Sequence, residues 1–162
     1  MKAKKALSLV LVCTIMLTLG TTILALERSE PTGIASSDPF SSDICIILSP
    51  QTRAADLMYS PKLFISSPSV GKISVSASVN AMKTVDKLGF TILEMERWDG
   101  NSWVPDATWT NKYSYSTSSF SWSGSAIGCV RGAYYKATCT FYAKIGTQVK
   151  TIDVETSYIT CR

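Results

Sequence analysis

The feature that most constrains the fold is a strict alternation of apolar and polar residues that begins after Gly71. Residues 73–80 read Ile-Ser-Val-Ser-Ala-Ser-Val-Asn, so an extended strand would carry apolar side chains on one face and polar ones on the other. Related patterns occupy residues 88–98, 135–143 and 148–158. Short strands separated by turn residues predict an all-β fold, namely a single antiparallel β-sandwich of the immunoglobulin-like or fibronectin-like type.

The same alternation predicts the core and one hairpin. Within residues 88–98 Leu88, Phe90 and Ile92 share one phase, whereas Leu93 and Met95 are apolar in the other, and a β-bulge near Ile92 and Leu93 would explain this shift. The sequence Asp-Gly-Asn at 99–101 is typical of a tight turn into the next strand. The side chains that share the apolar phase are expected to be buried: Ile73, Val75, Ala77, Leu88, Phe90, Tyr135, Ala137, Phe141, Ile152 and Val154.

The first 25 residues have the order of a secretory signal peptide. Lys2, Lys4 and Lys5 precede an apolar stretch that ends at Ala25, and polar residues follow. We expect cleavage after Ala25 and a protein that is secreted or lies on the extracellular surface, where thiols can oxidise. A stretch of this length could also span a bilayer. An uncleaved N-terminal anchor, with the domain still facing outward, is therefore the alternative, and it would be the only membrane contact.

The rest of the chain divides into an arm and a domain. Residues 26–66 are rich in Ser and Pro, which indicates a linker or a loosely ordered arm; a pro-segment is the alternative interpretation. Residues 44–48 interrupt this region with five apolar residues, which we expect to dock on the domain as an edge strand. Residues 67–162 then form the β-sandwich domain.

The expected register of the last hairpin predicts one disulfide. With a turn centred on Ile145 and Gly146, Lys144 would face Thr147, and Cys161 would lie next to Cys129. Cys139 would lie roughly nine residues away from Cys161, on the order of 30 Å along the strands and far beyond the reach of a bridge. We therefore predict a disulfide between Cys129 and Cys161. Cys45 and Cys139 either pair through docking of residues 44–48 or stay unbridged.

Composition excludes several kinds of site. The chain has no histidine, which rules out Ser-His-Asp and Cys-His catalysis and His-ligated zinc. It also has neither a CxxC spacing nor a Gly-rich phosphate loop, so we expect no cofactor and no metal. Without the three N-terminal lysines, thirteen basic residues face twelve acidic ones. Because no basic cluster remains, nucleic acid is not an expected partner.

One pair of carboxylates could still support catalysis. Glu94 and Glu96 would point to the same face of a strand, with backbones about 6.5 Å apart. Such a separation would suit a carboxylate-dependent glycosidase. Alternating carboxylates on an exposed strand face are more often solvated charges. We therefore predict a protein that is not an enzyme.

Aromatic residues offer a better functional lead. Four tryptophans and two tyrosines lie between positions 98 and 122, among Ser, Thr and Asn: Trp98, Trp103, Trp109, Trp122, Tyr113 and Tyr115. Exposed rings flanked by hydrogen-bonding side chains favour a sugar- or peptide-binding surface. A β-sandwich also needs tryptophan in its core, and we expect at least two of the four to be structural. The candidate ligand-binding residues are Trp98, Trp103, Trp109 and Tyr113.

Four segments, taken together, resemble a known family. They are residues 71–75, 85–88, 96–103 and 131–136, which read Gly-Lys-Ile-Ser-Val, Val-Asp-Lys-Leu, Glu-Arg-Trp-Asp-Gly-Asn-Ser-Trp and Arg-Gly-Ala-Tyr-Tyr-Lys. The chain from about 67 to 159 resembles a family of short secreted proteins of unknown function from Gram-positive, clostridia-like bacteria. The resemblance implies secretion and a β-sandwich, and it carries over no catalytic residue.

The sequence thus predicts a non-catalytic binding or interaction module. Its partner is unknown, with a cell-wall glycan or another extracellular protein as the two candidates. The first alternative is a carbohydrate- or cell-wall-binding module that uses exposed tryptophans. The second alternative is the glycosidase based on Glu94 and Glu96.

Overall fold

The structure, a computed structural model, describes residues 29–43, 45–48 and 57–162. Its regular elements in this part of the chain are strands: β1 (Ser41–Ser42), β2 (Cys45–Ile47), β3 (Met58–Ser69), β4 (Lys72–Trp98), β5 (Trp103–Ile127), β6 (Tyr134–Ile145), β7 (Gln148–Thr156) and β8 (Ile159–Thr160). The predicted all-β class is therefore confirmed. The predicted signal segment, residues 1–25, lies outside the described residues. No described helix is long and apolar enough to cross a membrane.

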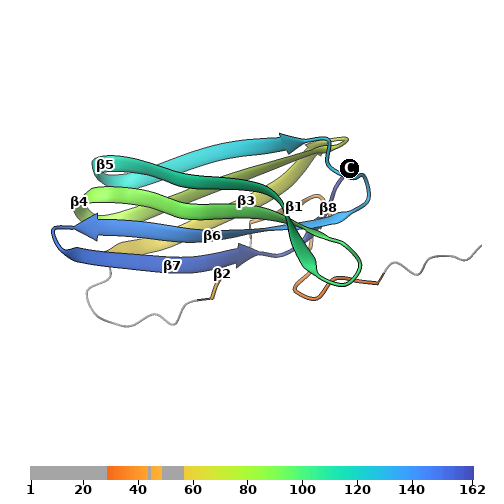
Figure 1. Ribbon diagram of the computed structural model, residues 1–162, viewed down its shortest axis with the longest axis horizontal. Helices are drawn as coiled ribbons and strands as arrows, with labels where there is room; N and C mark the ends of the chain where they lie inside the picture. Colours follow the sequence, from red (N-terminus) through yellow and green to blue (C-terminus); the bar gives the residue numbers. More distant parts are fainter. Residues whose placement is uncertain (1–28, 44, 49–56) are drawn as a thin grey trace, which may run out of the picture.

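The strands form one curled antiparallel sheet with the order β1-β3-β4-β6-β7-β2. The first half of β4 pairs with β3 and the second half with β6, while β5 follows β4 along both halves. Figure 1 shows β4 and β5 side by side, with β6 and β7 continuing the sheet. Only two residues separate β1 from β2, yet β1 pairs with β3 and β2 pairs with β7 at the other end of the sheet. The sheet must therefore curl until its two ends approach each other.

The core lies inside this curl, and all ten side chains predicted from the alternation are buried in it. The ring of Phe90 lies 5.9 Å from Phe120 and 5.3 Å from Trp122, between ring centroids. A bulge is also present, slightly before the predicted position near Ile92 and Leu93, since the register between β4 and β6 shifts between Phe90 and Ile92. Beyond the bulge Leu93 and Met95 are buried, which explains the shift in apolar phase.

The predicted boundary between arm and domain is displaced. Residue 67 falls inside β3, which begins at Met58. The Ser- and Pro-rich composition concealed this strand, because Pro61 and Pro68 lie at its two register shifts, where a missing N–H is tolerated. Leu63 and Ile65 between them are fully buried. The residues from Met58 to Ser66 therefore belong to the sheet.

The edge strand expected at residues 44–48 is observed as β2, which pairs antiparallel with β7. Residue 44 itself lies outside the described residues. The two long runs at 73–80 and 88–98 belong to a single strand, β4, whose middle is exposed at Met82. The Ser-rich region after Tyr113 continues β5 without interruption.

The register of the last hairpin differs from the expectation. Ile145 pairs with Gln148, and Lys144 pairs with Val149 rather than Thr147. The turn therefore consists of Gly146 and Thr147, and Gly146 takes a φ of 56°, which favours glycine. A shift of two residues preserves the alternation of faces. For this reason the core prediction for Ile152 and Val154 was correct although the register was wrong.

Candidate functional site

A short N-terminal segment lies across one end of the sheet, beside the turn between β4 and β5 (Figure 1). We call residues 29–36 the strap. At its start the Ser29 hydroxyl donates to the Gly100 carbonyl oxygen. At its end the Ser36 N–H donates to the Tyr158 carbonyl at 3.0 Å, and the Tyr158 N–H donates to the Ile34 carbonyl at 2.9 Å. The strap is thus held at both ends by hydrogen bonds to the domain.

Two tryptophans bind the backbone of the strap. The indole N–H of Trp98 donates to the Ser29 carbonyl at 2.9 Å, and that of Trp103 donates to the Thr32 carbonyl at 2.8 Å. Pro31 lies between these two carbonyls in the sequence and is buried. Backbone hydrogen bonds on both sides of a buried proline are a recurrent way for proteins to bind extended peptides. The domain thus holds the backbone of its own N-terminal segment through two indole donors.

Four rings form this site, which we call the aromatic cleft: Trp98, Trp103, Tyr134 and Tyr158. The ring centroids of Trp98 and Trp103 are 5.4 Å apart, those of Trp103 and Tyr158 are 6.1 Å apart, and those of Tyr134 and Tyr158 are 5.5 Å apart. Together with the strap, Trp103 and Tyr158 line a hollow of about 250 Å³. The cleft therefore draws its rings from β4, β5, β6 and the segment between β7 and β8.

The turn after β4 positions the two tryptophans. Trp98 pairs directly with Trp103 as the last pair of the β4–β5 hairpin. The Asp99 carboxylate accepts the backbone N–H groups of Asn101 and Ser102, both at 2.8 Å. These hydrogen bonds hold the pKa of Asp99 below its usual value, and the bond from Ser102 has the larger effect. The sequence predicted this turn correctly, and the turn places both indoles on the side that the strap covers.

Charged side chains also line the cleft. The Lys136 ammonium lies 3.0 Å from a Glu155 carboxylate oxygen and 3.5 Å from Glu96 Oε2. It also lies 5.1 Å from the centroid of the Trp103 ring. Lys136 and Glu155 line the hollow together with the strap. One cation is thus shared between Glu155, which lines the hollow, and Glu96, which does not.

The sequence predicted only part of this site. Trp98 and Trp103 were among the candidates, but Trp98 is only 5% exposed. Trp109 and Trp122 pack partly buried against the core, with centroids 5.3 Å apart. The expectation that at least two tryptophans are structural is therefore confirmed, and the four do not form one exposed aromatic face.

Tyr113, the remaining candidate, lies outside the cleft. Its ring is 5.6 Å from that of Tyr142, and the Lys87 ammonium lies 3.6 Å above its centroid. Partial burial raises the pKa of Tyr113. Tyr134 and Tyr158 escaped the sequence analysis because they lie outside the aromatic cluster at 98–122. Tyr134 lies in one of the segments that carry the family resemblance, and Tyr158 ends the pattern at 148–158, but neither feature indicated a binding site.

The carboxylates considered for catalysis share one face of β4, as expected. Glu96 pairs with Lys136, and neither Glu94 nor Glu96 lines the hollow at the cleft. Among the described residues, no group of three or more His, Cys, Asp or Glu side chains could hold a metal ion.

Cys129 and Cys161 are buried and are free thiols, so the structure lacks the predicted disulfide. Gly71 lies between the two segments: its carbonyl accepts the Cys129 N–H, and its N–H donates to the carbonyl of Arg162, the residue after Cys161, both at 3.0 Å. Burial raises the pKa of the Cys129 thiol, and the neighbouring Cys161 raises it further.

The other pairing left open by the sequence is excluded by the register. Cys45 pairs with Thr156 on one edge of β7, and Cys139 pairs with Val154 on the other edge. Two strand spacings, about 10 Å, therefore separate their backbones, whereas a disulfide requires Cα atoms within about 7 Å. Cys45 and Cys139 cannot be bridged in this arrangement.

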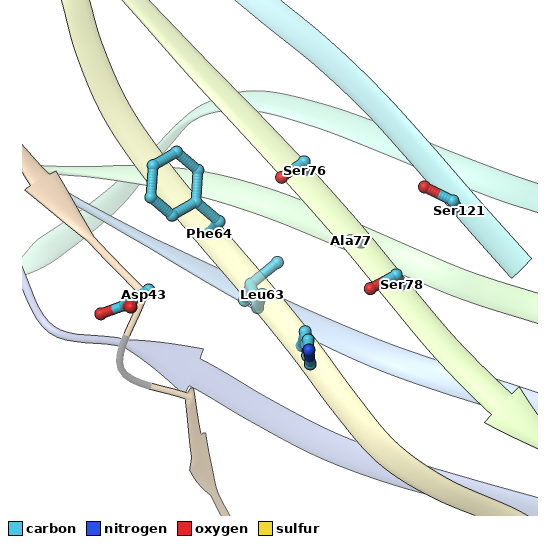
Figure 2. A pocket seen from close by; sticks show the side chains of 8 residues that line it. Asp43, Leu63, Phe64, Ser76, Ala77, Ser78 and Ser121 are labelled. Atoms are coloured by element: carbon cyan, nitrogen blue, oxygen red, sulfur yellow. The ribbon is translucent and has the colours of Figure 1, made fainter.

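A second hollow, of about 400 Å³, lies on the outer face of β3, β4 and β5. Figure 2 shows the Phe64 ring at one side and the hydroxyl groups of Ser76, Ser78 and Ser121 on the neighbouring strands. Phe64 pairs with Ser76, and Ser78 pairs with both Lys62 and Ser121. Phe64 is 38% exposed. This surface thus combines one accessible ring with a row of hydroxyl groups.

Comparisons of the chain with protein-family models, with curated proteins and with solved structures find no match.

Proposed function

We propose that this protein is a secreted or surface-exposed, non-catalytic interaction module that binds an extended, proline-containing peptide in its aromatic cleft. The observation that carries the proposal is the pair of indole N–H groups that bind the Ser29 and Thr32 carbonyls around the buried Pro31. The apolar N-terminal stretch supports the extracellular location. As the scaffold we propose an immunoglobulin-like or fibronectin-like sandwich whose two layers are formed by the two ends of the single curled sheet.

The chemistry of the cleft suits a peptide better than a small molecule. Indole N–H donors that bind backbone carbonyls recognise the path of a chain, and a proline ring packs well on aromatic rings. An extended proline-containing segment also loses little conformational entropy when it binds. Each hydrogen bond contributes only about 0.5–1.5 kcal/mol net, so affinity for a short peptide would be modest.

The strap occupies the cleft intramolecularly and therefore competes with any external peptide. A tethered segment acts at a high effective concentration. An external ligand must then bind more tightly than the strap, or the strap must be removed.

A strap-deleted variant tests the proposal. The chain would begin at Ser37, and a synthetic peptide with the sequence of residues 29–36 would be titrated while tryptophan fluorescence is recorded. We expect a saturable change, and a weaker one for a peptide with Pro31→Ala. Trp103→Phe in the domain should weaken binding, whereas Trp109→Phe serves as the matched control outside the cleft. No saturable change with the native peptide would overturn the proposal.

If the shortened chain does not fold, a second variant replaces it. A protease site introduced between Ser36 and Ser37 in the full chain would release the strap after folding. We expect the cleaved strap to remain bound in size-exclusion chromatography at high protein concentration and to dissociate on dilution. Immediate loss of the strap at all concentrations would contradict the proposal.

Carbohydrate or cell-wall binding is the second candidate, and the hollow in Figure 2 favours it. An accessible ring beside hydroxyl groups can stack on a sugar ring and exchange hydrogen bonds with it. Phe64→Ala should reduce retention of the protein on insoluble peptidoglycan, and Tyr115→Ala, at another exposed ring, is the control. Equal retention of both variants would remove the support for this candidate. Support for a glycosidase is weaker, because Glu96 is paired with Lys136.

A further inference from the structure

Strand β5 lies at an edge of the sheet along its whole length. It pairs with β4 from Trp103 to Ile127, and among the described residues no other strand pairs with it. Figure 1 shows its second half, in cyan, along the upper border of the molecule. An unpaired strand edge presents backbone N–H and C=O groups that can bind another extended chain.

The first half of this edge carries features that oppose such pairing. Pro105 lies at a register shift against β4 and offers no N–H. Asn111 and Ser116 take positive φ values of 54° and 50°, which interrupt the extended conformation. Asp106 and Lys112 place charges along the same stretch. Proteins commonly use such features to keep strand edges from associating.

The second half of β5 has none of these features. From Ser119 to Ile127 the register against β4 is constant. These nine residues include no proline, no charged residue and no positive φ. We call residues 119–127 the open edge. Protection is thus confined to one half of a single strand.

A side-chain contact shows which backbone groups of the open edge point away from β4. The Ser119 N–H donates to the Thr117 hydroxyl at 3.2 Å, and this hydroxyl donates to the Ser119 carbonyl at 2.9 Å. Both groups of Ser119 are therefore turned away from β4. Alternate residues of an antiparallel strand direct their N–H and C=O to the same side. The residues that present unpaired groups at the edge are then Ser121, Ser123 and Ser125.

The apolar side chains of the open edge are incompletely covered. Phe120 is buried, but Trp122 and Ala126 are only partly buried where they pack against the core. The Trp122 ring leans over Gly124, where a Cβ atom would collide with it. A strand added beside β5 would cover the exposed parts of these side chains and bind the unpaired backbone groups.

We infer that a second copy of this chain binds along the open edge in antiparallel orientation, with Ser123 facing Ser123 of the second copy. In this register Phe120 faces Ala126 and Trp122 faces Gly124 of the second copy, so each ring meets a small residue. The open edge carries no charge, so no repulsion between like charges opposes its approach to an identical stretch. A two-fold axis makes these contacts reciprocal and closes the dimer.

This dimer goes beyond the proposed peptide binding, because no residue of the open edge belongs to the aromatic cleft. A nine-residue edge is about 30 Å long. A single strand pair of this length provides less area than the roughly 1,200 Å² that specific, stable interfaces bury at least. We therefore expect a dimer that dissociates on dilution.

Sedimentation velocity on the chain from residue 26, from micromolar to hundreds of micromolar, tests this association. The average mass of the parent should rise from that of a monomer toward that of a dimer. Ser123→Lys would place two ammonium groups opposite each other and should raise the dissociation constant several-fold. Thr110→Lys, at an exposed position in the protected half of β5, is the matched control and should leave it unchanged.

A charge swap distinguishes self-pairing at residue 123 from general repulsion. Ser123→Asp alone should weaken the dimer as Ser123→Lys does, whereas an equimolar mixture of the two variants should associate at least as tightly as the parent. This gain should shrink as salt is added. A parent that stays monomeric throughout the range, a mixture no tighter than either variant, or equal effects of Ser123→Lys and Thr110→Lys would overturn the inference.

Cross-linking tests the register with smaller substitutions. Ser123→Cys should give a covalent dimer with a short bifunctional thiol reagent, because facing Cα atoms lie about 5.5 Å apart. Ser119→Cys is the control, since its two copies would lie about 26 Å apart along the strands, and the parent corrects for the native cysteines. Equal cross-linking at both positions, or none at residue 123, would contradict the proposed pairing.

Discussion

The indole N–H of Trp98 donates to the carbonyl oxygen of Ser29 at 2.9 Å, although the two residues are 69 positions apart in the chain. Trp98 is 5% exposed, so a ring that the sequence marked as a candidate ligand contact is already covered. Its neighbour Trp103 makes the corresponding bond to Thr32. Two indole donors thus hold the backbone of one N-terminal segment, and the proposed peptide-binding function rests on this arrangement.

Phe90 should be one of the least replaceable residues of the core. It is fully buried and contacts the rings of Phe120 and Trp122 from the opposite half of the β4–β5 hairpin. Phe90→Ala would leave a cavity between the two halves and should lower the free energy of unfolding by about 3–5 kcal/mol. Chemical denaturation measures the loss. Tyr115→Ala, at a ring that is 69% exposed, should change stability by less than about 0.5 kcal/mol.

Asp99 should stabilise the β4–β5 turn in a pH-dependent way. Its pKa is lowered in the folded protein by the N–H groups of Ser102 and Asn101, so the folded state favours the carboxylate. This contribution is present above the unfolded pKa of about 3.9 and is lost as the pH falls through the lower folded pKa. We expect Asp99→Ala to melt below the parent at pH 7, with the gap closing in acid. A gap that persists at pH 2 would contradict this explanation.

A disulfide between Cys129 and Cys161 remains our prediction for the oxidised protein. Both thiols are buried, and Gly71 is hydrogen-bonded both to Cys129 and to Arg162, the residue after Cys161. The bridge would close a loop of about 32 residues, for which a stabilisation of about 3–4 kcal/mol is expected. Peptide mapping without reductant should recover the Cys129–Cys161 pair. Recovery of Cys139 linked to either residue would contradict the register of β6.

Local alternation predicted those parts of the fold that depend on one strand at a time. The buried residues of β4, β6 and β7 followed from period-two patterns, as did a bulge close to Ile92. The error in the last hairpin arose because Gly146 can occupy either position of a two-residue turn, and a shift of two residues leaves the pattern unchanged. Burial was therefore predictable where register was not.

Other features of the fold could not be predicted from the local sequence pattern. β3 has prolines at its irregular positions and buries Ser67 while Phe64 is exposed, so its composition indicated an arm. β1 and β2 stand at opposite ends of the strand order, and the curl that brings these two ends together depends on long-range pairing. The aromatic cleft also depends on contacts between distant parts of the chain, because its rings come from β4, β5, β6 and the segment after β7.

Hydrogen exchange of the tryptophan indole N–H groups, followed by ¹⁵N NMR on the folded chain from residue 26, tests the central claim most directly. We predict that the Trp98 and Trp103 indole protons are protected in the intact chain and lose protection when residues 29–36 are deleted. The Trp109 and Trp122 signals, which report on the core, should keep their exchange rates. Unchanged protection of Trp98 and Trp103 after the deletion would contradict the assignment of the cleft as a peptide-binding site.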